Sequence, residues 1–250
     1  MCCFTGPVLS VCNTKIFARD AGEKRQYLAY AMDLKTAKEV AMVLPLPVPA
    51  KSAEDAVKFI DLSGYPTLFT DLYTMMDFPK PGTSKSRGER SIEAPEPILV
   101  VQTVGAFDAS FVPSIADFAR LDERFRLPAG TWDKLPAYRD YGFAVFKLKA
   151  GEQHFHPMAF SFPRRDDTTL FFPTVHIHDG TVTEKANFDH YLYAQLGKQL
   201  GAKDWEESPG HANGKVDIKR AMDIVAGDQH VYFQSLRGRL ANQDTLLKLG

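Results

Sequence analysis

The sequence predicts an α+β fold, with mainly antiparallel sheets and several short helices packed on one side. Strand-like runs follow one another at residues 142–148, 155–162 and 170–178, which is typical of antiparallel sheets. No strand–helix–strand unit repeats along the chain, so a doubly wound parallel sheet is not expected. Of the 250 residues, 44% are hydrophobic and 24% are charged, as in folded globular proteins. We therefore expect a single α+β domain over residues 1–250.

The N-terminal part predicts a β-hairpin built from residues 26–32 and 40–48, which carry apolar side chains over the length of a strand. Prolines follow at positions 45, 47 and 49, and each removes a backbone hydrogen-bond donor. The second run should therefore leave the sheet beyond Leu44.

Two helices are expected next. Ser52, Glu54 and Asp55 form a helix start that leads into apolar residues up to position 60. A second helix opens at Pro66. Its apolar residues recur at intervals of three and four, at Leu68, Phe69, Leu72, Tyr73 and Met76. This stripe predicts a helix face that packs in the core.

Residues 79–97 are rich in Pro, Gly, Ser and charge, and we expect a mobile loop there. A strand should follow over 98–104, and then a capped helix that starts at Ser114 and ends before Pro128.

The last third of the chain predicts a strand over residues 188–196 and a closing strand over 230–236. Between them, residues 217–226 predict a short helix with an aspartate cap.

The charge balance excludes some classes of function. Thirty basic and 31 acidic side chains leave a formal net charge of -1, so we expect neither a nucleic acid nor a membrane as partner. The N-terminus lacks the features of a secretion signal, and no run approaches 18 apolar residues. A cytoplasmic location is therefore expected. The three cysteines, Cys2, Cys3 and Cys12, predict free thiols.

Histidines supply the leading site prediction. Five of the seven fall within residues 154–190: His154, His156, His176, His178 and His190. Residues two apart on a strand point to the same face, so His154 and His156 form one pair and His176 and His178 form another. If an antiparallel hairpin pairs positions whose numbers sum to an even value, all four imidazoles converge. With an odd sum, the two pairs lie on opposite faces.

The apolar neighbours of these histidines favour convergence, with His190 as a further ligand from the next strand and Asp179 and Asp189 as carboxylates nearby. This predicts a cytoplasmic metal-binding protein that takes zinc, copper, nickel or iron. It would be a metal-dependent enzyme acting on an unknown small molecule if one coordination position stays open. The alternative is that these histidines are core or surface groups hydrogen-bonded to their neighbours.

Cys2 supports a second hypothesis. If Met1 is removed, the α-amine of Cys2 can act as base for its own thiol, as in N-terminal-nucleophile amidohydrolases. Arg19 and Asp20 weakly resemble the Arg and Asp that follow the nucleophile in cysteine members of the penicillin acylase and bile-salt hydrolase type. Alternatively, cysteine thiolates could complete the histidine metal site. A third hypothesis is a non-catalytic binding domain.

Several segments also resemble a bacterial domain family of unknown function. Its members begin with a cysteine-bearing segment and a Pro-Val pair, followed by a Val-Pro-Val-Pro-like strand end and later by a strand of Phe-x-Ala-x-Lys-Leu type. The matching stretches are residues 2–8, 41–49, 53–69, 141–149 and 157–160. The resemblance would cover roughly residues 1–185 and implies one continuous fold without a known activity. The chain departs from that family because it lacks a secretion signal and carries the paired histidines.

Overall fold

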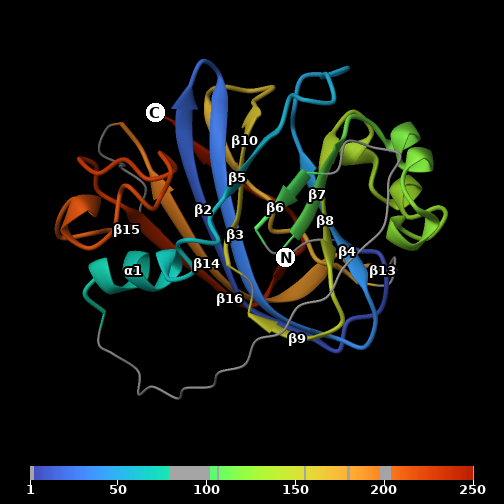
Figure 1. The fold of residues 1–250 in the computed structure, drawn as a ribbon, viewed down its shortest axis with the longest axis horizontal. Helices are drawn as coiled ribbons and strands as arrows, with labels where there is room; N and C mark the ends of the chain where they lie inside the picture. The colour runs from blue at the N-terminus through green and yellow to red at the C-terminus, as the bar shows by residue number, and fades with distance from the viewer. Residues whose placement is uncertain are drawn as a thin grey trace.

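Two large β-sheets lie face to face in the computed structural model, which describes residues 3–78, 102–105, 107–154, 156–178, 181–197 and 204–249 (Figure 1). A two-stranded sheet adds β11 (Thr169–Phe172) and β17 (Thr245–Lys248).

The first sheet has seven strands in the order β13-β12-β1-β4-β8-β7-β6. Their bounds are β1 Cys3–Phe4, β4 Val40–Leu46, β6 Gln102–Val104, β7 Phe107–Val112, β8 Gly142–Leu148, β12 Ile177–His178 and β13 Thr181–Val182. Most neighbours are antiparallel, but β1 and β12 pair in parallel, with Cys3 opposite Ile177. Residues at the N-terminus therefore pair with residues about 175 positions later in the sequence.

The second sheet has eight strands, in the order β15-β16-β14-β2-β3-β10-β5, with β9 paired to one end of β3. Their bounds are β2 Ser10–Gly22, β3 Arg25–Thr36, β5 Lys58–Asp61, β9 Gly151–His154, β10 Met158–Pro163, β14 Lys185–Gln195, β15 Glu206–Glu207 and β16 Tyr232–Ala241. The long hairpin of β2 and β3 carries the other strands on either side.

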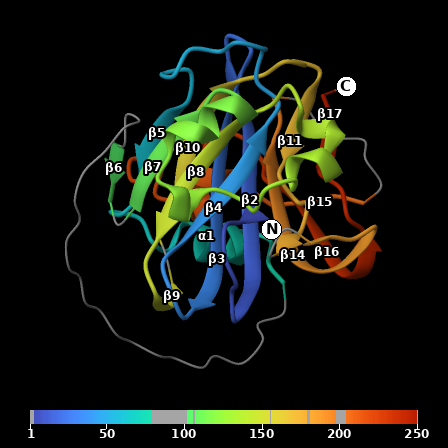
Figure 2. The same cartoon turned by 90° about the vertical axis from the view of Figure 1, so that its right-hand side faces the viewer.

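Side chains on both faces of each sheet are buried, which produces four layers. The largest core lies between the sheets and includes Tyr30, Phe146 and Phe160. The outer face of the second sheet is covered by helix α1 (Leu68–Met75) and by the chain around Ala212 and Ile224. Short 3₁₀ helices cover the outer face of the first sheet, and Figure 2 shows them in green in front of β8.

The prediction of an α+β fold is wrong, because the described residues are mainly β. The predicted helix around residues 68–76 is confirmed as α1. Residues 58–61, however, form β5, because Phe59 and Ile60 pair with β10 and this long-range pairing outweighs the local helix start. Residues 115–125 form two 3₁₀ helices, Ile115–Arg120 and Glu123–Phe125, separated by extended backbone at Leu121. Residues 217–226 form turns in place of the expected helix.

Strand positions were predicted better than strand partners. β8 has the expected bounds, and β14 and β16 confirm the strands expected near 188–196 and 230–236. The expected hairpin of residues 26–32 and 40–48 is wrong, since β3 pairs with β2 while β4 belongs to the other sheet. β4 also continues to Leu46, past Pro45, because β1 reaches only as far as Val43 on that edge. The predicted loop at 79–97 lies outside the described residues.

None of the helices in the described ranges is long and apolar enough to cross a membrane.

Gln26 is a buried polar residue that ties the small sheet to the second sheet. Its amide nitrogen donates to the carbonyl of Phe171 at 2.7 Å, and its amide oxygen accepts from the backbone N–H of Phe171 at 2.9 Å. We expect Gln26→Leu to lower the free energy of unfolding by about 2–4 kcal/mol, because two buried backbone groups lose their partner. Urea denaturation measures this, with the exposed Gln243→Leu as control. Equal stability of the two variants would contradict the assignment.

Candidate functional site

The structure does not bring the two histidine pairs onto neighbouring strands. β10 pairs with β3 and β5, whereas β12 pairs with β1 and β13 in the other sheet. His154 ends β9 and lies opposite Asp33, and His178 ends β12 and lies opposite Thr181. The predicted hairpin, whose register was to decide the facing of the imidazoles, is therefore absent.

His156 occupies a half-buried position beside a tight turn. Its ring lies 4.5 Å from the ring of Phe107, and a Cβ on Gly105 would come within 2.5 Å of its Nε2 atom. Gly105 has a φ of +60°, so the turn needs glycine both for its backbone and for this close approach. Burial lowers the pKa of His156, so the neutral imidazole is favoured and packs as part of the core.

His176 and His190 are the two predicted ligands that do meet. Their rings stack with centroids 4.9 Å apart, and Phe188 packs against both. His190 is fully buried, and burial holds its pKa far below the usual value of a histidine. The backbone of His176 is fixed by Asn242, whose side chain bonds to both its N–H and its carbonyl. This pair is therefore packed in the interior, and the His190 ring is neutral there.

The predicted metal-binding function is wrong. Among the described side chains, no three histidines, cysteines, aspartates or glutamates gather closely enough to hold an ion. The side chains of His154 and His178, and the whole of Cys2 and Asp179, lie outside the described part, so the suspected zinc, copper, nickel or iron stays an untested prediction. Cys3 is buried in β1 and Cys12 is exposed on β2, and neither takes part in a disulfide. The proposed N-terminal nucleophile is likewise untested.

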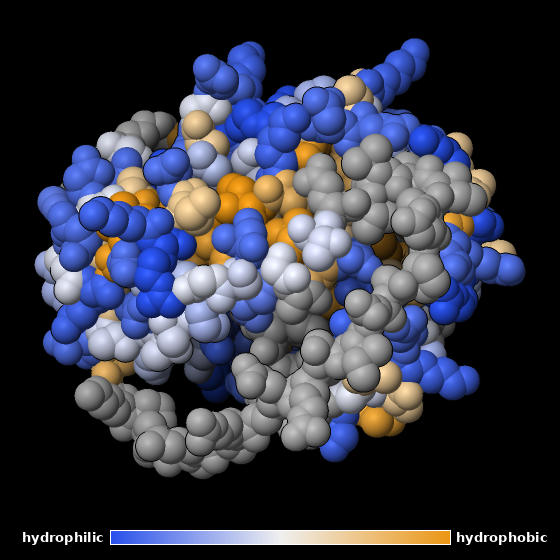
Figure 3. Space-filling model, in the orientation of Figure 1, coloured by the Kyte–Doolittle hydropathy of each residue, from blue (hydrophilic) through white to orange (hydrophobic). Residues whose placement is uncertain are grey.

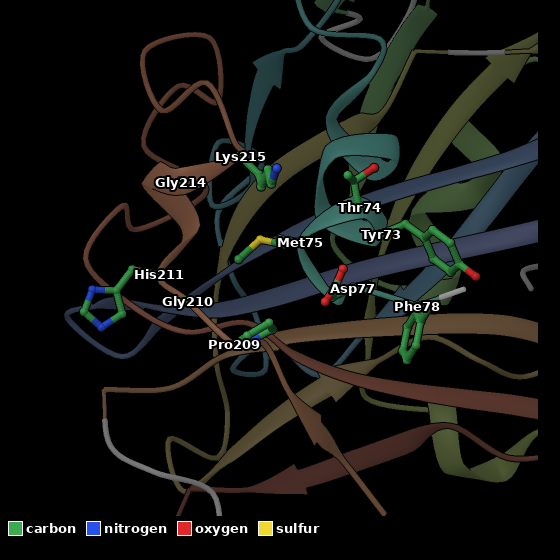
Figure 4. Close-up of a pocket in the computed structure, with 10 residues that line it drawn as sticks. All are labelled: Tyr73, Thr74, Met75, Asp77, Phe78, Pro209, Gly210, His211, Gly214 and Lys215. Carbon is green, nitrogen blue, oxygen red and sulfur yellow. The ribbon is translucent and has the colours of Figure 1, made fainter. Parts of the chain in front are cut away.

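A cleft lies on another part of the molecule, between the end of α1 and the loop that precedes residue 216. Its volume is about 400 Å³. α1 and the residues after it supply one wall, and the loop supplies the other (Figure 4). The lining residues are Tyr73, Thr74, Met75, Asp77, Phe78, Pro209, Gly210, His211, Gly214 and Lys215.

Packed aromatic rings support the α1 side of this cleft. The ring of Phe78 lies 4.9 Å from that of Phe233 on β16, and the ring of Tyr73 lies 5.9 Å from that of Tyr191 on β14. Tyr73, Phe78 and Tyr191 are half-buried, so one side of each ring packs on the sheet and the other side is accessible. We call these three residues the aromatic ledge.

Hydrogen bonds through Tyr65 join the two walls of the cleft. Its hydroxyl donates to Asp71 of α1 at 2.6 Å and accepts from the backbone N–H of Asp217 at 2.8 Å. Burial and the nearby Asp71 raise the pKa of Tyr65 to about 12, so the hydroxyl stays protonated as a donor. Arg220 stacks over the same ring and donates to the carbonyl of Gly64. The cleft is therefore preorganised.

The rim of the cleft carries opposite charges on its two walls. Asp77 is exposed and has a φ of +55°, an uncommon conformation for a residue with a side chain. Lys215 is exposed on the loop wall, which also carries His211. The side chain of Ser208 links two backbone segments, since its hydroxyl donates to the carbonyl of Gly210 and accepts from the N–H of Val231. Aromatic support and a charged rim suit the binding of protein side chains.

The sequence contained part of this site. The stripe of residues 68–76 predicted α1 but assigned Tyr73 to the core only. The meeting of α1 with residues 209–215 has no sequence signal, because the two segments are about 135 positions apart and no spacing rule connects them.

On the face that Figure 3 shows, apolar side chains gather in the middle and polar ones form most of the border. Smaller apolar spots also lie near the border of this face, among polar side chains.

Comparison with known proteins gives a fold without a family. No protein-family model matches the chain, and no curated relative does. Solved structures of baculovirus P35 are similar. One covers 99% of this chain and 99% of its own, with a TM-score of 0.53 and 13% identity. A mutated baculovirus P35 after caspase cleavage covers 95% of this chain and 100% of its own, with a TM-score of 0.51 and 13% identity. The chain thus has a P35-like, mainly β fold.

These comparisons correct two expectations. The resemblance to a bacterial domain family is wrong, because no family model matches and the solved structures with this fold are of a baculovirus protein. The expectation of a small-molecule partner is also wrong. The mutated baculovirus P35 with this fold was solved after cleavage by a caspase, so the precedent among structures of this fold is a protein partner.

The buried position of His190 predicts a pH dependence of stability. Its pKa is lowered in the folded state, so acidification below about 6.5 protonates only the unfolded chain and destabilises the fold. Between pH 7.5 and 5.5 this amounts to about 1.4 kcal/mol. Burial raises the pKa of Asp244 to about 6, which acts in the opposite direction over this range but equally in wild type and variant.

From pH 7.5 to 5.5, we therefore expect the free energy of unfolding to decrease by about 1.4 kcal/mol less in His190→Leu than in the wild type. Urea denaturation at both pH values measures the difference. The exposed His211→Leu serves as control and should keep the wild-type slope. A wild-type slope in His190→Leu would contradict the buried, neutral state of this ring.

Proposed function

We propose that the chain is a non-catalytic protein ligand of a caspase-class protease. The observation that carries this proposal is the fold shared with baculovirus P35 over 99% of both chains, together with the P35 structure solved after caspase cleavage. The cleft supports the same reading, because its preorganised walls and charged rim suit a protein surface. A preorganised site loses less conformational entropy on association.

Asp77 is the residue that we propose the protease recognises. A caspase, as its name states, is a cysteine protease directed at aspartate. Asp77 is exposed at the end of α1, in the sequence Thr-Met-Met-Asp, and its left-handed backbone turns the chain at the rim of the cleft. Such a conformation persists only where the surroundings hold it, which here are α1 and the aromatic ledge.

Asp223 provides the comparison. It is also exposed, also left-handed with a φ of +63°, and also follows a methionine. Its turn is clamped at the backbone, since Arg19 donates to the carbonyls of Asp223 and Ile224. Asp223 shares most local features with Asp77 but does not line the cleft.

We assign this protein to the cytoplasm. Cys3 and Cys12 take part in no disulfide, and cysteines outside disulfides are typical of a reducing compartment.

Titration of the purified full chain into a panel of recombinant caspases tests the proposal. We expect at least one caspase to lose activity on a fluorogenic aspartyl peptide, with an end point near one chain per active site. Asp77→Asn should weaken this inhibition by about 100-fold or more, because the protease pocket for a carboxylate is left unpaired.

Asp223→Asn is the matched control and should inhibit like the wild type. Mass spectrometry of the mixture locates any cut, which we expect after residue 77. Activity of all caspases at a tenfold excess of the wild-type chain would overturn the proposed function. Equal inhibition by Asp77→Asn and the wild type would overturn the role of Asp77.

A further inference from the structure

The outer edge of β16 is the longest open strand edge in the part of the chain that the structure describes. β15 pairs with β16 only at Tyr232 and Phe233. No described residue pairs with the outer edge from position 234 to Ala241. The terminal strands elsewhere in the two large sheets are short, with two residues in β13, three in β6 and four in β5. Short edges are a common protection against unwanted strand pairing, and β16 lacks it.

The two faces of this edge differ in chemistry. Arg237 and Arg239 lie on the same face as Phe233, toward α1, because residues alternate along the strand. Leu236 lies on the other face, against the core between the sheets, and Leu240 shares that face by alternation and is 37% exposed. A strand added here would meet two guanidinium groups on one face and two leucines on the other.

Arg237 is already oriented by its neighbours. Its guanidinium lies 4.9 Å from the ring centre of Tyr191 of the aromatic ledge and donates to the hydroxyl of that residue. Its Nε also donates to Ser235 at 3.2 Å. Asp189, which lies opposite Arg237 on β14, accepts a hydrogen bond from the backbone of Asn13 at 2.7 Å. A positioned guanidinium of this kind is well suited to bind a carboxylate.

We propose that the open edge of β16 binds an extended, acidic segment of a partner protein as an added strand. Strand addition satisfies the open backbone groups, and side chains at alternate positions provide specificity. Carboxylates on one face of the added strand pair with Arg237 and Arg239, while apolar side chains on its other face cover Leu236 and Leu240. This inference goes beyond the proposed caspase binding and does not depend on it.

The chain itself supplies a precedent for this occupant. β15, which covers the first two positions of the edge in antiparallel orientation, is the acidic pair Glu206–Glu207. The open edge continues in line with this existing pairing. A partner strand would therefore extend an antiparallel pairing that the fold already uses, in which the paired segment is acidic.

The charges also argue against a second copy of the chain as occupant. An antiparallel pairing of two β16 edges centred on Gly238 would place Arg237 of one copy opposite Arg239 of the other. Like charges directly opposite each other destabilise strand pairing. Gly238 itself has a φ of +86° and open space around its position, so no side chain blocks the approach of a partner strand.

Fluorescence anisotropy of a labelled octapeptide of alternating glutamate and valine, titrated with the full chain, tests the proposal. We expect saturable binding that weakens with added salt. An octapeptide of alternating lysine and valine should bind at least about tenfold more weakly, because its charges oppose those of the edge. N-methylation of alternate amides in the glutamate peptide should also lower its affinity at least about tenfold, since the methylated peptide cannot complete the strand hydrogen bonds.

The double variant Arg237→Glu/Arg239→Glu should bind the acidic peptide about tenfold more weakly or worse, and should bind the basic peptide more tightly than the wild type does. The control Lys38→Glu/Lys149→Glu reverses two exposed charges away from this edge and should bind like the wild type. Hydrogen exchange on the wild-type complex, which needs no variant, should slow only within residues 234–241.

Absence of saturable binding would overturn the proposal. Slowed exchange elsewhere, or equal binding by the arginine variant and the wild type, would do the same. A concentration-dependent dimer that buries residues 234–241 would assign the edge to a second copy and also overturn it.

Discussion

The architecture depends on the burial of both faces of the second sheet. One face packs against the first sheet around Phe146 and Phe160, and the other needs a separate cover. α1 and residues 212–231 supply that cover over β2, β14 and β16. Because burial of apolar area is the main stabilising contribution, this cover decides which parts of the outer face stay accessible. The cleft lies where α1 meets the loop of residues 209–215. The aromatic ledge lies where this cover leaves the rings half-buried.

Local patterns in the sequence predicted several elements but few of their partners. β8, β14 and α1 follow from apolar periodicity, because the signal lies within each segment. The placement of β1 between β4 and β12 brings Cys3 next to Ile177, and no local pattern encodes such a contact. The helix signal at residues 52–60 was real in composition, yet pairing of β5 with β10 determined the structure there. Fold class failed for this reason, since it depends on pairings.

The histidines show the same limit at the level of a site. Two His-x-His repeats 20 residues apart suggested one hairpin, but β9 and β12 belong to different sheets. Only His176 and His190 meet, and burial keeps His190 neutral in a stacked pair. The clustering of histidines in the sequence drew attention to these residues. The alternative that they are core groups describes His176 and His190. The cleft residues of α1 were predicted as part of a helix, whereas the contact of α1 with the loop depends on Tyr65 and Arg220, which carry no motif.

The central claim is that a protein partner docks on the cleft between α1 and residues 209–215. Hydrogen exchange of the full chain with and without a caspase whose active-site cysteine is replaced by alanine tests this claim most directly, because binding is then observed without cleavage. The account predicts slower exchange in residues 73–78 and 209–215 of the complex. A stable complex in which both segments exchange at their free rates would contradict it.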